Sequence, residues 1–146
     1  MRGDPKRKTK PLFVVEDDPD QQELLKLMLD RVCLPSQVVC FSTGEKLMEH
    51  MNKLVSKQGL SDEEIPTLIT LDLRLPGVDG LEVLQVIRSH DKFSKVPVLV
   101  LTASQLADDV KASYRLGGTV FLRKPFEEEE LKNILQQLRI MGLLKG

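Results

Sequence analysis

The chain has 146 residues, a length that fits one domain of ordinary size. Its formal net charge is -1, so its overall charge does not attract nucleic acid or an anionic membrane. Aromatic residues make up 4% of the chain and Trp is absent, which argues against a surface on which nucleic-acid bases stack.

The N-terminal residues 1–10 are basic, since five of them are Lys or Arg and the only acid is Asp4. No apolar run follows them, so the segment is neither a signal peptide nor a membrane span. We therefore expect a flexible basic tail. Cys33 and Cys40 match no metal-binding or redox spacing, and they indicate reduced thiols in a cytoplasmic protein.

A short apolar run at residues 12–15 predicts the first strand, and three acids follow it before Pro19. Asp18 suits the N-cap of a helix, and Pro19 suits its first position. Apolar residues at helical spacing then continue to Val32. A second strand at residues 38–41 leads into a second predicted helix.

The central feature is the segment 68–76, in which a run of β-favouring apolar residues stops at Asp72 and Pro76 ends the regular structure. Such a run predicts a strand buried on both faces. Asp72 would then lie at the carboxyl end of the strand, where open α/β sheets bind ligands. Taken alone, a capping Asp in a tight turn is the better interpretation of this residue.

The fourth predicted strand, residues 96–101, ends in Thr102. Leu106, Val110 and Tyr114 mark the helix after it, and their spacing predicts that they pack toward the core. Two glycines close that helix.

A fifth strand at residues 119–122 leads to Lys124 and Pro125. The last helix carries an acidic first turn at residues 127–130, where the helix dipole favours negative charge. Five strands that alternate with five helices predict an α/β fold with a parallel sheet and right-handed crossovers.

Parallel strands all point the same way, so their polar ends meet at one edge of the sheet. That edge is expected to collect the acids of residues 16–18 with Asp72, Thr102 and Lys124. Converging carboxylates repel one another, and a hard dication such as Mg²⁺ makes the cluster tolerable. A hydroxyl and an ammonium facing it suggest a phosphoryl group, with Asp72 as the acceptor oxygen.

Four segments carry a family resemblance: Val-Val-Glu-Asp-Asp-Pro at 14–19, Leu-Asp-Leu-Arg-Leu-Pro-Gly-Val-Asp-Gly at 71–80, Leu-Thr-Ala at 101–103 and Phe-Leu-Arg-Lys-Pro at 121–125. Each is weak alone, but in this order they resemble the receiver domain of two-component response regulators. The resemblance implies a receiver domain at residues 11–140, followed by an apolar C-terminal tail at 141–146. It also implies a doubly wound, flavodoxin-like sheet of five parallel strands in the order 2-1-3-4-5, with five helices.

The same resemblance implies roles for individual residues. Asp72 corresponds to the phosphorylated aspartate of the family. Asp17 would ligate Mg²⁺ directly, Glu16 through water, and Arg74 through its backbone carbonyl. Asp18, one position past the acidic pair, is given a supporting role.

The remaining site residues follow in the last two strands. Thr102 and Phe121 resemble the switch pair of receivers, a hydroxyl that turns toward the phosphoryl group and an aromatic ring that follows it. Lys124 resembles the lysine that binds a phosphoryl oxygen, and the Lys124–Pro125 peptide bond is expected to be cis.

A narrower resemblance concerns residues 108–117 and the long connection at 58–66, which are similar to small stand-alone regulators paired with phytochrome histidine kinases. It implies a sensor histidine kinase as partner, in the narrower case a phytochrome. A homodimer through the fourth helix, fifth strand and fifth helix is expected, with cations at Lys111 and Arg115 facing the acids of 127–130.

Two other functions compete with a phosphorylated signalling module that is not itself an enzyme. An aspartate-nucleophile phosphohydrolase would need a second Asp two residues after Asp72, where this chain has Arg74. A non-phosphorylated protein-binding module would not need the intact set of acids, Thr102 and Lys124. Arg74 also departs from the small polar residues frequent at its position in receivers.

Overall fold

The computed structural model describes residues 10–32, 37–103 and 107–144, without the side chains of 107–110. One parallel sheet has the strand order β2-β1-β3-β4-β5, so the predicted fold class and order are confirmed. The strands are β1 (Pro11–Val15), β2 (Gln37–Phe41), β3 (Leu68–Asp72), β4 (Val98–Thr102) and β5 (Val120–Arg123).

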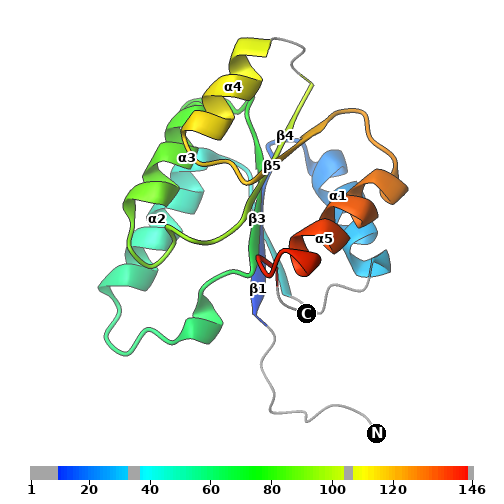
Figure 1. The fold of residues 1–146 in the computed structure, drawn as a ribbon. Coiled ribbons are helices and arrows are strands. Elements are labelled where there is room, and N and C mark those ends of the chain that lie inside the picture. Colours follow the sequence, from blue (N-terminus) through cyan, green and yellow to red (C-terminus); the bar gives the residue numbers. More distant parts are fainter. Residues whose placement is uncertain (1–9, 33–36, 104–106, 145–146) are drawn as a thin grey trace, which may run out of the picture.

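Helices cover both faces of this sheet. They are α1 (Pro19–Arg31), α2 (Gly44–Ser56), α3 (Gly80–Ser89), α4 (Ala107–Arg115) and α5 (Glu128–Ile140), with a short 3-10 helix, η1 (Asp62–Glu64), before β3. Figure 1 shows α2, α3 and α4 on one face and α1 and α5 on the other. None of the helices in the described part of the chain has the length and apolar character needed to span a membrane.

The sheet separates two hydrophobic clusters. Side chains alternate along a strand, so Ile69 and Leu71 of β3 pack on the α2–α3 side, whereas Leu68 packs on the α1–α5 side. All five residues of β3, and all five of β4, are buried. The continuous apolar runs in the sequence therefore belong to central strands, as predicted.

The ends of the helices follow the local sequence. The Asp18 carboxylate accepts a hydrogen bond from the Asp20 amide at 2.9 Å, and Pro19 begins α1, as predicted. In α5, Glu127 is the N-cap and forms a capping box with Glu130. This box explains part of the acidic run at the start of α5.

The packing of α4 differs from the prediction. Tyr114 was expected to pack toward the core, but it is 52% exposed, and its neighbour Ser113 is the buried residue of that turn. Ser113 and Tyr114 lie three and four positions after Val110, and both spacings are typical of one helix face. The spacing alone therefore does not distinguish Ser113 from Tyr114 as the buried residue. The smaller side chain, that of Ser113, faces inward. The backbone carbonyl of Ser113 accepts a hydrogen bond from the Gly118 amide at 2.8 Å.

The C-terminal tail is partly packed. Gly142 has a φ of +76°, and the Leu143 and Leu144 amides both donate to the Leu138 carbonyl, at 2.9 and 3.2 Å. Leu144 is 3% exposed within the α1–α5 cluster, whereas Ile140 is 85% exposed. Most of the predicted basic tail, residues 1–9, and Cys33 lie outside the described residues.

Candidate functional site

Four strands end in polar residues at one edge of the sheet. Glu16 directly follows β1, Asp72 and Thr102 end β3 and β4, and Lys124 directly follows β5. The strand register brings these ends together, since Asp72 pairs with Leu101 in the neighbouring strand. Residues that are far apart in the sequence thus meet where the sequence predicted that they would.

Three carboxylates converge at this edge. Each of Glu16, Asp17 and Asp72 offers an oxygen, and these oxygens lie within 4.8 Å of one another. Glu16 and Asp72 are buried and Asp17 is exposed, whereas the Asp18 carboxylate is used by the cap of α1. A set of hard oxygen donors with one open side fits a hydrated dication such as Mg²⁺.

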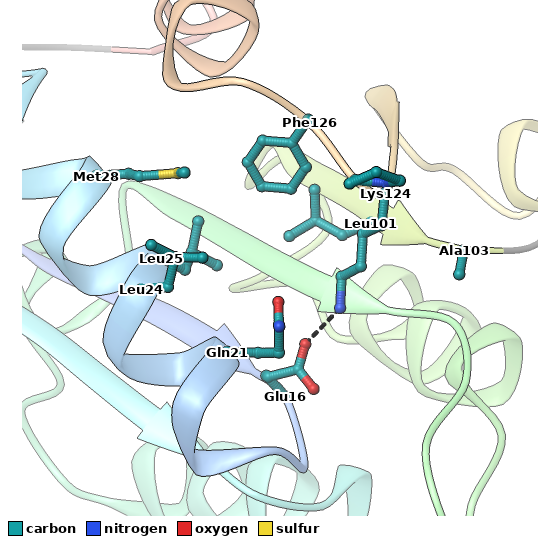
Figure 2. A pocket seen from close by; sticks show the side chains of 10 residues that line it. Glu16, Gln21, Leu24, Leu25, Met28, Leu101, Ala103, Lys124 and Phe126 are labelled. Carbon is teal, nitrogen blue, oxygen red and sulfur yellow. Dashed lines mark hydrogen bonds and ion pairs between the residues drawn. The ribbon is translucent and has the colours of Figure 1, made fainter.

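Lys124 lies between two of these acids. Its Nζ is 2.6 Å from Glu16 Oε1 and 3.0 Å from Asp72 Oδ2; Figure 2 shows the pair with Glu16. Burial lowers the pKa of Lys124, but the hydrogen bonds and charges of Glu16 and Asp72 outweigh burial and hold that pKa above its ordinary value. Burial raises the pKa of Glu16, and the hydrogen bonds from Lys124 and from the Asp18 amide only partly offset it.

The backbone around Asp72 is tightly held. Its Oδ1 accepts a hydrogen bond from the Arg74 amide at 2.9 Å. At Gly80, the first residue of α3, a Cβ would lie 2.7 Å from the Asp72 carbonyl oxygen, so only glycine lets α3 begin this close to the strand end. The Arg74 side chain is exposed, and among the described residues it forms no ion pair.

The predicted switch residues lie on adjacent strands. Thr102 is fully buried at the end of β4, and Phe121 of β5 is half-buried against the α2–α3 cluster. The Lys124 amide donates to the Thr102 carbonyl at 2.9 Å, which ties the two strand ends together. The Lys124–Pro125 peptide bond is cis, as predicted.

An apolar hollow of about 350 Å³ opens beside the ion pair of Glu16 and Lys124. Leu24 and Met28 of α1 lie on one side and Phe126 on the other (Figure 2). Leu24 belongs to the apolar stripe predicted for α1, yet it is 45% exposed because it lines this hollow.

One residue that supports the acidic pair is not predictable from the sequence pattern. The Gln22 side-chain amide of α1 donates to the Glu16 carbonyl oxygen and so holds the backbone at the end of β1. A polar residue in the second turn of a helix is usually solvated, and only the path of the chain after β1 turns it inward.

The sequence matches the model of the response regulator receiver domain over residues 12–136. The chain belongs to this family. It is 31% identical over 135 residues to the response regulator Rcp1 of Synechocystis sp., covering 92% of this chain and 89% of Rcp1. The crystal structure of Mn²⁺-bound Rcp1 superposes with a TM-score of 0.70 at 30% identity, over 94% of this chain and 99% of that one.

Two further solved receivers bear on the site. The phosphorylated cyanobacterial phytochrome response regulator RcpA has 33% identity and a TM-score of 0.69, over 90% of this receiver and 91% of RcpA. The receiver domain of a sensor histidine kinase from Pseudomonas aeruginosa PAO1 has 27% identity and a TM-score of 0.71, over 88% and 96% of the two chains. That domain holds a magnesium ion in its active-site cleft. This receiver has an acidic group, Glu16, Asp17 and Asp72, of the kind that holds such an ion.

Proposed function

We propose that this receiver is a response regulator that accepts a phosphoryl group from a sensor histidine kinase onto Asp72, with Mg²⁺. The observation that carries the proposal is the contact of Lys124 Nζ with Asp72 Oδ2, within a group of three converging carboxylates. A half-buried ammonium beside a carboxylate at the open edge of the sheet is suited to a dianionic phosphoryl group.

Phosphoryl transfer breaks the N–P bond of the kinase's phosphohistidine and forms an O–P bond to Asp72. An Asp72 oxygen attacks the phosphorus of the kinase's phosphohistidine, the O–P bond forms, and the imidazole nitrogen keeps the electrons of the N–P bond that breaks. Lys124 would bind a phosphoryl oxygen, and the Thr102 hydroxyl would donate a hydrogen bond to another. When bound by Glu16, Asp17, Asp72 and the Arg74 carbonyl, Mg²⁺ would offset negative charge on the carboxylates and the incoming group.

Acetyl phosphate with Mg²⁺ tests this function and separates it from the alternatives. We expect one acid-stable, base-labile phosphoryl adduct by intact mass, which is absent from Asp72→Asn. Rapid multiple turnover without an adduct would indicate a phosphohydrolase, and no reaction would indicate a protein-binding module. Label retained on a folded Asp72→Asn variant would show that another residue is the acceptor.

The partner and the location of this receiver also belong to the proposal. Its similarity to RcpA and Rcp1 over about nine-tenths of the chain supports a phytochrome histidine kinase as the phosphodonor. Cys40 is a free, exposed thiol on β2, which supports a cytoplasmic location. Phosphotransfer from a panel of purified kinases tests the pairing, since the cognate kinase is expected to transfer fastest.

We further propose a homodimer through α4, β5 and α5. Thr102 and Phe121 lie beside this face, so a change at Asp72 reaches it through direct packing. Lys111 and Arg115 are exposed on α4 and offer positive charge to the acidic start of α5 across a two-fold axis. Tyr114 is 52% exposed on the same helix.

Sedimentation with and without beryllofluoride, a mimic of the phosphoryl group, tests this interface. We expect association to weaken when Lys111 and Arg115 are both replaced by Glu. A monomer at all concentrations in both states, or a dimer unaffected by this charge reversal, would contradict the interface.

A further inference from the structure

Arg88, in the last turn of α3, donates hydrogen bonds to neutral groups. Its Nε donates to the Gly117 carbonyl at 2.8 Å, and its Nη2 donates to Thr119 Oγ1 at 3.3 Å. Its Nη1 donates to three carbonyls, those of Val96 at 2.7 Å, Ser94 at 3.1 Å and Phe93 at 3.3 Å. Among the described residues, no carboxylate pairs with this half-buried guanidinium. Its hydrogen bonds therefore serve backbone segments and not an ion pair.

The partners of Arg88 belong to the two segments that lead into β4 and β5. Thr119 joins these segments, because its Oγ1 accepts from the Val98 amide at 3.0 Å and its own amide donates to the Val98 carbonyl at 3.0 Å. Gly117 has a φ of +100°, and a Cβ there would lie 2.7 Å from Arg88 Nε. Arg88, Thr119 and Val98 thus form one network at the start of both strands.

The position of β5 depends on few interactions. It has four residues and lies at the edge of the sheet, where β4 is its one neighbour. A slip of one residue would turn its side chains to the opposite face. In the observed register Phe121 pairs with Val100 and Arg123 with Thr102, which places Lys124 beside the acids. The register of β5 therefore decides where Lys124 and Phe121 lie.

We propose that Arg88 is a positioning residue that fixes the register of β5 on β4 and so holds Lys124 and Phe121 in place at the phosphoryl-binding site. The inference rests on the proposed function, because it concerns the residues that would contact the phosphoryl group. The planar guanidinium presents five donors in a fixed geometry, which a lysine ammonium does not reproduce. Arg88 acts from the opposite end of the strands and touches none of the acids.

The β1–β3 side and the β4–β5 side of the site bind different ligands, which provides a test of the proposal. A general loss of stability would weaken the binding of both ligands, whereas a displaced Lys124 would weaken only one. Mg²⁺ would be held mainly from β1 and β3, whereas beryllofluoride also needs Lys124 and Thr102 from the β4–β5 side. In Arg88→Met we expect no loss of affinity for Mg²⁺, because a displaced Lys124 competes less for Glu16 and Asp72, while the affinity for beryllofluoride in saturating Mg²⁺ falls about tenfold to hundredfold. Titration calorimetry measures both in the same protein.

Matched variants complete the test. Lys92→Met, an exposed cation in the same α3–β4 segment, is expected to change neither affinity. Arg88→Lys is expected to behave like Arg88→Met, because charge alone does not restore the hydrogen bonds. If Arg88→Met does not fold, Thr119→Val removes one partner of the network and is expected to lose affinity for beryllofluoride selectively. Equal losses for both ligands, or no loss, would overturn the proposal.

A failure of the proposed phosphoacceptor function can be distinguished from a failure of the role proposed for Arg88. If the unsubstituted protein binds Mg²⁺ but no beryllofluoride, the phosphoacceptor function fails whatever Arg88 does. The register of β5 is then followed by hydrogen exchange at the Lys124 amide, which is bonded to the Thr102 carbonyl. Faster exchange in Arg88→Met than in Lys92→Met supports the role of Arg88 in the register, and equal exchange overturns it.

Discussion

Lys124 Nζ lies closer to Glu16 Oε1, at 2.6 Å, than to Asp72 Oδ2, at 3.0 Å. The two carboxylates are buried and would otherwise face each other without a neutralising charge. In the metal-free protein the ammonium therefore offsets part of the negative charge of the acidic group. Mg²⁺, when it binds, brings positive charge to the same carboxylates.

Replacement of Lys124 by Ala is expected to destabilise the metal-free protein by about 2 kcal/mol, because two buried carboxylates lose their partner. It is also expected to enlarge the stabilisation by Mg²⁺, since the ammonium no longer competes for Glu16 and Asp72. Urea unfolding with and without Mg²⁺ measures both effects, with Lys92→Met as the control. A smaller stabilisation by Mg²⁺ in Lys124→Ala would contradict this competition.

Mg²⁺ is expected to raise the melting temperature of the unsubstituted protein. Binding to the native state alone adds about 2.7 kcal/mol at about a hundredfold excess over Kd. Asp17→Asn is expected to raise the metal-free melting temperature, because it relieves repulsion, and to weaken Mg²⁺ binding. Glu23→Gln, an exposed acid of α1, serves as the control. A melting temperature that does not respond to Mg²⁺ in the parent would exclude this metal site.

Arg74 is expected to set the lifetime of the phosphoryl group. Its backbone is fixed by the bond from its amide to Asp72, while its side chain is exposed and free of ion pairs among the described residues. A long cation two residues from the acceptor is placed to control how water reaches the phosphorus. We expect Arg74→Asn to change the half-life of the adduct, measured by loss of intact-mass signal. An unchanged half-life would refute this role.

The stability of the fold is expected to fall as the pH drops through the histidine range. The His50 ring contacts Phe13 and Phe41, with centroids 5.5 and 5.3 Å away. Burial, and secondarily the charge of Lys53, lowers its pKa below the ordinary value of 6.5. The unfolded chain therefore binds a proton at higher pH than the folded one, so the contribution is complete above about pH 6.5 and is lost below it.

His50→Phe keeps an aromatic ring and removes the titration. We expect the free energy of unfolding to depend less on pH in this variant than in the parent between about pH 5 and 7, as measured by urea titrations. The parent, measured in the same buffers, is the comparison. A parent slope retained in His50→Phe would assign the pH dependence to other groups.

The C-terminal residues offer a matched pair of side chains. Leu144→Ala is expected to destabilise the domain by about 2 kcal/mol or more, because Leu144 is buried against the α1–α5 cluster. Ile140→Ala is expected to have little effect on the stability of the monomer, since that side chain is 85% exposed. Equal effects of the two substitutions in urea unfolding would contradict the packed position of Leu144.

Most of the site was predictable because parallel strands bring their polar ends to one edge. Asp72, Thr102 and Lys124 each follow an apolar run, so their meeting needed only the order of the strands. The pairing of Lys124 with Glu16 was not predictable, because it depends on side-chain length and on the distance between β1 and β5. Tyr114 was misplaced because two adjacent positions satisfy the same helical spacing.

Arg88 was overlooked for a different physical reason. A cation in the last turn of a helix normally faces solvent and favours the negative end of the helix dipole. Its observed partners are four backbone carbonyl groups and the Thr119 hydroxyl. Every residue carries a carbonyl group, so the sequence does not indicate which ones an arginine binds. Networks of this kind become visible only when the backbone is known.

The contact between Glu16 and Lys124 joins residues 108 positions apart. When the acids after β1 and β3 come together without β5, Lys124 does not relieve their repulsion. Docking of β5 brings the ammonium between Glu16 and Asp72, so the position of this edge strand and the charge at the carboxyl edge of the sheet depend on each other. A chain that ends before β5 would therefore retain the repulsion without the cation that relieves it.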